Sequence, residues 1–142
     1  MNNNNATIFL SKLIGIAEIL VALSMFMHKQ AFIALLTAML QDRPLLFLIS
    51  IIMVIAGLAI VLCHNIWSGR ALPVVVTLFG WAIMIKGLLS LFFAPEMIIS
   101  ALGTLHFEEY FYLYAAAPLI LGLYLAYGGF RSSLPSSARS RR

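Results

Sequence analysis

The fold of this chain is decided by the stretch that reads HNIWSGRALPVVVTLFGWAIMIKGLLSLFFAP from His64 to Pro95. It begins with a polar turn that contains a glycine. An apolar run follows that is close to the length of about 20 residues needed to cross a bilayer as a helix. One charged side chain, Lys86, interrupts this run. The stretch therefore predicts a turn at a membrane surface that leads directly into a membrane-spanning helix.

The composition of the whole chain is that of a membrane protein. Of its 142 residues, 63% are hydrophobic and 10% are charged, whereas a soluble domain carries about 25% charged residues. The single cysteine, Cys63, excludes an internal disulfide and a cysteine-rich metal site. The net charge of +4 is concentrated in the C-terminal tail, so we expect no nucleic-acid partner. We expect an all-α membrane protein.

Apolar runs along the sequence predict four spans and two short interfacial helices. The spans are expected over about residues 7–27, 45–63, 72–94 and 109–128, and the short helices over about 31–41 and 96–106. Together they form a single transmembrane domain over residues 7–130. We expect a disordered leader over residues 1–6 and a basic cytoplasmic tail over residues 131–142.

The order of span, short helix and span occurs twice. A shift of 65 residues places Gly15 on Gly80 and Gly57 on Gly122. Such a tandem parallel repeat predicts a pseudo-twofold axis along the membrane normal. Small residues allow membrane helices to approach closely. The small residues expected at helix contacts are Gly15, Ala22, Gly57, Gly80, Gly87 and Gly122.

The distribution of lysine and arginine predicts the orientation. Lys12, Arg70 and the basic tail would lie on one side, whereas Lys29 and Arg43 would lie on the other. Basic residues accumulate on the cytoplasmic side of membrane proteins. We therefore expect both termini in the cytoplasm and the two short helices on the outer face.

Two opposite charges, Glu18 and Lys86, are predicted near the middle of the first and third spans. Each charge costs about 2.5–3.5 kcal/mol at the centre of a helix in a membrane, so both should face the protein interior. Their similar depths predict a pair, either direct or bridged by water. The pair would be part of an ion or proton pathway, or a structural link that sets the order of the helices. The apolar neighbours of Glu18 favour the structural link.

The turn offers a second group of polar and aromatic residues, namely His64, Asn65, Trp67 and Arg70. They would form a small site for a lipid headgroup or a cytoplasmic ligand. Alternatively, each has a separate structural role, in which Asn65 ends a helix, Trp67 lies at the interface and Arg70 contacts phosphates. No metal or cofactor is expected, and the sequence contains no catalytic motif, so we expect no enzymatic activity.

The central stretch also carries a recognisable pattern. A Gly57–Val61 run leads to His64-Asn65-x-Trp67, and Thr77-x-x-Gly80-Trp81 is followed by Lys86-Gly87 and Pro95. Over about residues 45–95 the chain resembles a family of small, uncharacterised bacterial four-span integral membrane proteins. The resemblance implies a bacterial inner-membrane protein and brings no activity. The small multidrug-resistance transporters also have four spans with a carboxylate in the first, but they are shorter and lack the buried lysine.

Two functions remain open from the sequence. The first is a non-catalytic accessory or scaffold component that binds lipid, partner helices or further copies of itself in a homo-oligomer. The alternative is a small transporter or channel that uses the Glu18 and Lys86 pair. The first is favoured because the spans contain few polar residues. The sequence does not identify a ligand, a partner or an oligomeric state.

Overall fold

The computed structural model describes residues 3–133, except for the side chains of residues 3, 4 and 102, and this part of the chain folds into helices. The elements are α1 (Asn3–Met27), α2 (Lys29–Gln41), α3 (Arg43–Cys63), α4 (Ala71–Phe92), α5 (Pro95–Thr104) and α6 (Phe111–Ser132). By length and composition, α1, α3, α4 and α6 are able to cross a membrane. The expected all-α class with four spans and two short helices is confirmed.

Some helix ends differ from the expected ones. The first helix begins at Asn3, so residues 3–6, expected in a disordered leader, form its first turn. At the other end α6 continues to Ser132, so the tail expected from residue 131 begins two residues later. Residues 1–2 and 134–142 of the expected leader and tail lie outside the described residues. The helix α5 ends at Thr104 rather than at 106, because His106 adopts a left-handed φ of 49° that a continuing helix does not allow.

Local sequence explains the sharp change of direction between α2 and α3. Asp42 is the one residue between these helices, and its carboxylate accepts a hydrogen bond from the Leu45 amide at 3.0 Å. This is the usual way in which an aspartate caps a helix N-terminus. Pro44 in the first turn lacks an amide proton at a position where none is needed. The chain can therefore turn without a longer loop.

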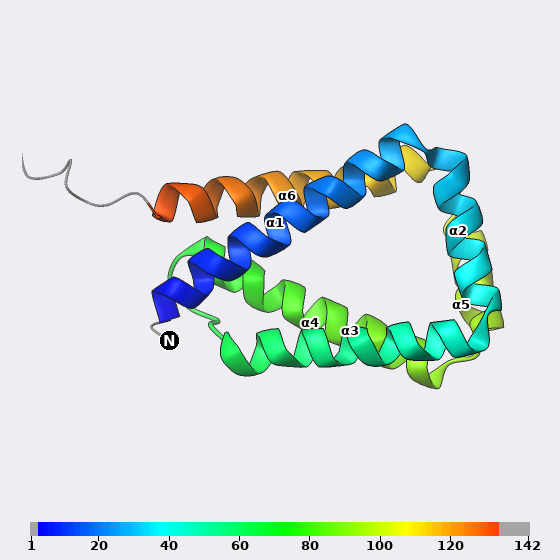
Figure 1. Cartoon of the computed structure of the whole chain (residues 1–142), viewed down its shortest axis with the longest axis horizontal. Coiled ribbons are helices and arrows are strands. Elements are labelled where there is room, and N and C mark those ends of the chain that lie inside the picture. The colour runs from blue at the N-terminus through cyan, green and yellow to red at the C-terminus, as the bar shows by residue number, and fades with distance from the viewer. Residues whose placement is uncertain (1–2, 134–142) are drawn as a thin grey trace, which may run out of the picture.

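The four long helices form two pairs, and α1 packs along α6 whereas α3 packs along α4. Figure 1 shows that the pairs approach each other near the α3–α4 turn and separate toward the opposite end. At that opposite end α2 and α5 lie side by side across the ends of the long helices. The two short helices thus share one end of the molecule, while the first residues of α1, the last residues of α6 and the α3–α4 turn share the other.

Glycines bring the helices of each pair into backbone contact. A Cβ atom on Gly57 of α3 would lie 2.5 Å from the amide nitrogen of Met84 and 2.8 Å from the carbonyl oxygen of Gly80, both in α4. Real Cβ atoms do not approach backbone atoms so closely. A glycine at this position is therefore required for α3 and α4 to pack at the observed distance.

The α1–α6 pair repeats this geometry. A Cβ atom on Gly122 of α6 would lie 2.9 Å from the amide nitrogen of Ile19 and 2.9 Å from the carbonyl oxygen of Gly15, both in α1. A shift of 65 residues converts each member of the α3–α4 contact into the corresponding member of this one. The two contacts therefore involve residues that are 65 positions apart in the sequence. The other expected small residues, Ala22 and Gly87, are also buried.

The outward faces of the long helices are apolar. Leu20 of α1, Leu62 of α3 and Ile120 of α6 are each more than 60% exposed, at 62%, 75% and 67%. Such a surface has no stable contact with water over this length, whereas lipid chains accommodate it. The fold therefore presents two tightly packed helix pairs with lipid-compatible exteriors.

Candidate functional site

The turn between α3 and α4 is held in place by Thr77 of α4. The Ile66 amide donates a hydrogen bond to the Thr77 hydroxyl oxygen at 3.0 Å. The same hydroxyl lies 3.0 Å from the carbonyl oxygen of His64 and 3.1 Å from that of Pro73, and its one proton is shared between such acceptors. Thr77 is fully buried. One side chain thus fastens the turn to the first two turns of α4.

His64 connects the turn with the other helix pair. The residue is 2% exposed, and its Nε2 atom lies 3.5 Å from the hydroxyl oxygen of Thr7 in α1. Burial lowers the pKa of His64, and a hydrogen bond with the Pro73 backbone offsets this in part. The imidazole is therefore neutral at physiological pH. His64 is also the residue that ends α3, a role that the sequence had suggested for Asn65.

The remaining turn residues lie on the surface. Asn65, Trp67 and Arg70 are exposed, and the Trp67 indole N–H donates to the Asn65 side-chain oxygen. Gly69 has a φ of 101°, which suits glycine at the tip of the turn. His64 points inward while the other three face outward. The four residues are thus not gathered into a single binding site.

Glu18 and Lys86 lie on helices of different pairs, α1 and α4. In the part of the chain that the structure describes, they form no ion pair within 4.0 Å, although Lys86 acts electrostatically on Glu18 at longer range. The expected direct pair is therefore wrong, and a water-bridged pair stays a prediction. The ion pair that the structure does contain joins Arg43 and Glu96 at 3.0 Å, and both side chains are largely exposed.

Lys86 lines a groove between α2, α3, α4 and α5, which we call the Lys86 groove. Its volume is about 520 Å³, and most of its lining is apolar, including Leu46 and Met97. Besides Lys86, the polar members are Ser50 and Ser90. The Ser50 hydroxyl donates to the Leu46 carbonyl at 2.7 Å and is fully buried, so it is already satisfied. The ammonium of Lys86 is thus the dominant polar group of an otherwise hydrophobic groove.

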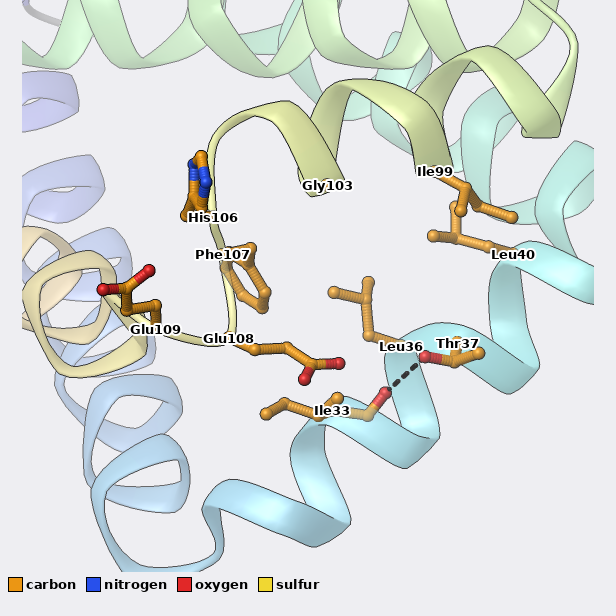
Figure 2. Close-up of a pocket in the computed structure, with 10 residues that line it drawn as sticks. All are labelled: Ile33, Leu36, Thr37, Leu40, Ile99, Gly103, His106, Phe107, Glu108 and Glu109. Carbon is orange, nitrogen blue, oxygen red and sulfur yellow. Dashed lines mark hydrogen bonds between the residues drawn. The ribbon is translucent and has the colours of Figure 1, made fainter.

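A second cavity of about 380 Å³ lies between α2, α5 and the following loop. Figure 2 shows Glu108 directed into the space next to α2, whereas Glu109 points away from it. The Thr37 hydroxyl donates to the carbonyl of Ile33 within its own helix at 2.9 Å. His106 Nδ1 lies 3.0 Å from the Thr104 carbonyl. No cluster of His, Cys, Asp or Glu among residues 3–133 has the arrangement of a metal site.

Several contacts were not anticipated from the sequence. A Cβ atom on Gly129 of α6 would lie 2.9 Å from the Lys12 side chain, so this glycine also packs closely. The Lys12 ammonium lies 4.7 Å from the centre of the Phe130 ring. The sequence contained one indication of the role of Thr77. A threonine four residues after Pro73 in a helix is placed to donate its hydroxyl proton to the Pro73 carbonyl.

Comparison with known proteins gives no relative: no protein-family model matches the chain, and no curated protein or solved structure is similar to it. The class therefore comes from the fold. Four apolar helices of membrane-spanning length make this a multi-pass α-helical membrane protein. The resemblance to a bacterial four-span family stays a prediction.

Proposed function

We propose that this protein is a non-catalytic accessory or scaffold component of a bacterial inner membrane, with both termini in the cytoplasm, that binds lipid or partner helices. The observation that supports this proposal is that polar residues of the spanning helices are buried between helices. Ser11, Ser50 and Thr77 are fully buried in helix packing. Ser50 and Thr77 are also hydrogen-bonded to backbone groups. They do not line a continuous polar route through the membrane.

The arrangement of the helices suits a scaffold. The two helices of each pair pack closely because glycines allow backbone contact, whereas the two pairs contact each other less. The apolar outward faces offer surfaces to lipid and to helices of other membrane proteins. A structure of this kind holds partners without needing a reactive group.

The proposal is tested by purifying the full chain from its native membrane in mild detergent and analysing it by native mass spectrometry. We expect a stable complex with a different membrane protein, with bound lipid, or with both. A homodimer with no bound lipid or other protein that carries pH-dependent ion flux in liposomes would overturn the proposal.

The alternative of a small transporter or channel is favoured by one observation. Glu18 and Lys86 interact electrostatically between the two helix pairs without forming a direct ion pair. If they belong to a pathway, Glu18→Gln should abolish pH-dependent flux in liposomes. The matched control is Glu96→Gln, because Glu96 lies at the surface in its ion pair with Arg43.

A further inference from the structure

The Lys86 groove has a counterpart in the other half of the molecule that is filled by aromatic side chains. A shift of 65 residues relates Leu46 of the groove to Phe111, and Met97 to Phe32. Phe111 is fully buried, and the centres of the Phe111 and Phe32 rings lie 6.0 Å apart. Phe107 adds a third ring at 5.7 Å from Phe111. One half is thus closed by side chains where the other half is open.

The same shift shows that the open half is also the polar half. Lys86 corresponds to Val21, and Ser90 corresponds to Met25, which packs in the aromatic cluster. Three groove residues are smaller than their counterparts, namely Leu46, Ser90 and Met97 against Phe111, Met25 and Phe32. Lys86 differs in charge, since its counterpart Val21 is an exposed apolar residue. Packing alone does not require this difference, since the filled half shows that the fold accepts bulky residues there.

Among residues 3–133 no carboxylate contacts Lys86 directly, and Glu18 acts on it only at longer range. Lys86 is exposed within the described structure. It lies six residues before Phe92, the end of α4, which corresponds to about 9 Å along the helix. A lysine at such a depth extends its flexible stem toward the headgroup level. The ammonium thus lies within reach of lipid headgroups at the end where α2 and α5 lie.

We propose that the Lys86 groove holds one acyl chain of an anionic phospholipid, whose phosphate binds the ammonium of Lys86. The inference rests on the proposed function, because it specifies the lipid that the scaffold binds. The volume of about 520 Å³ is within the usual range for small-molecule sites. The apolar lining suits a hydrocarbon chain, and an ammonium group forms charge-assisted hydrogen bonds with a phosphate. The Arg43–Glu96 ion pair ties the start of α3 to the start of α5, two of the helices that line the groove.

The test measures lipid binding to the full chain in mild detergent by native mass spectrometry, with phosphatidylglycerol as the probe. Binding of phosphatidylethanolamine, which has no net charge, shows whether the negative headgroup charge is needed. Binding of inorganic phosphate shows whether the acyl chain is needed. We expect one phosphatidylglycerol to bind, and Lys86→Gln to weaken it about tenfold because a charge-assisted contact is lost. Lys86→Arg should retain binding. The matched control is Lys12→Gln, since Lys12 lies in a span but contacts Phe130 instead of the groove.

A second variant blocks the space for the acyl chain of the lipid and leaves the charge of Lys86 unchanged. Met97→Phe places in the groove the side chain that its counterpart has at position 32, so it should weaken phosphatidylglycerol binding while Lys86 remains. Equal binding of phosphatidylglycerol and phosphatidylethanolamine to the unmodified chain would overturn the inference even if a variant fails to fold. Binding that is unchanged in both Lys86→Gln and Met97→Phe would also overturn it. If the lipid inference fails but the protein still purifies with a different membrane protein, the proposed accessory function is retained. If a homodimer without lipid or other protein carries pH-dependent ion flux, the proposed accessory function is also overturned.

Discussion

Two buried polar side chains, Thr77 and His64, hold the α3–α4 turn against both helix pairs. The Thr77 hydroxyl accepts a hydrogen bond from the Ile66 amide and lies within hydrogen-bond distance of the His64 carbonyl, so it satisfies backbone groups of the turn. His64 contacts Thr7 of α1 and so links the turn to the α1–α6 pair. Because both are buried, their roles are structural, and changing them should alter stability rather than a surface interaction.

Replacing Thr77 by valine keeps the shape of the side chain and removes its hydroxyl. The Ile66 amide then loses its acceptor, so we expect the free energy of unfolding to fall by about 1–3 kcal/mol. Unfolding in mixed detergent micelles measures this change. Thr77→Ser is the control, since it keeps the hydroxyl and should be closer to the unmodified chain. Equal stability of Thr77→Val and the unmodified chain would contradict the assigned role.

The buried ring of His64 predicts a pH dependence. Its pKa in the folded state is below the usual value of 6.5, so the unfolded state binds more protons at mildly acidic pH. The stabilisation is complete above about pH 6.5, and it is lost as the pH falls through the folded pKa. Thermal unfolding between pH 8 and pH 5 should show this loss. It should disappear in His64→Gln and persist in His28→Gln, and a loss of equal size in both variants would assign it to other groups.

At the level of helices, glycines determine how closely the members of each pair approach. Gly57 in α3 and Gly122 in α6 occupy equivalent contacts, each against the backbone of the neighbouring helix. At Gly57 the three nearest atoms to an added Cβ all belong to the backbone, so an added methyl group has to push the helices apart. At Gly122 two of the three are backbone atoms and the third belongs to the Ile19 side chain. The loss of stability on replacing a glycine should therefore depend on the distance from the added Cβ to the neighbouring backbone, and not simply on whether the glycine is buried.

Gly57→Ala tests this contact. Its Cβ atom would lie 2.5 Å from the Met84 amide nitrogen, so we expect a loss of about 1–3 kcal/mol in the free energy of unfolding from overpacking. Gly103→Ala in α5 is the matched control, because no atom lies within 4 Å of the added Cβ. The control should be neutral or slightly stabilising, since alanine favours a helix. If both variants lose the same stability, helix contact is not the reason for glycine at position 57.

For the molecule as a whole, the main feature is the placement of its two ends. The α3–α4 turn lies at the same end as the first residues of α1 and the last residues of α6, and α2 and α5 lie at the other. The structure thus shows which segments share an end of the molecule. The proposal that the turn faces the cytoplasm rests on the distribution of basic residues.

Thiol labelling tests the orientation. The exposed Cys63 is first replaced by serine, and single cysteines are then introduced at Ser68 in the turn and at Ser100 in α5. In intact cells a membrane-impermeant reagent should label position 100 and leave position 68 unlabelled until the membrane is opened. Labelling of position 68 from outside would reverse the proposed orientation.

Those properties that depend on local sequence could be predicted without the structure. The length of each apolar run sets the number of spans, because the thickness of the bilayer is fixed. Gly15, Gly57, Gly80 and Gly122 could be expected at helix contacts, because glycine is the residue that allows two backbones to touch. The starts of α3 and α5 lie close to Pro44 and Pro95, because proline suits the first turn of a helix.

The tertiary structure alone decided which groups meet. Glu18 and Lys86 were expected to pair because their positions along α1 and α4 give similar depths, but depth does not establish contact. The helices α1 and α4 pack against α6 and α3 instead, and the two pairs separate toward α2 and α5. Lys86 consequently lines a groove and does not form a direct ion pair with Glu18. The pairing of helices depends on contacts between residues far apart in the chain, and for that reason the sequence pattern alone did not predict it.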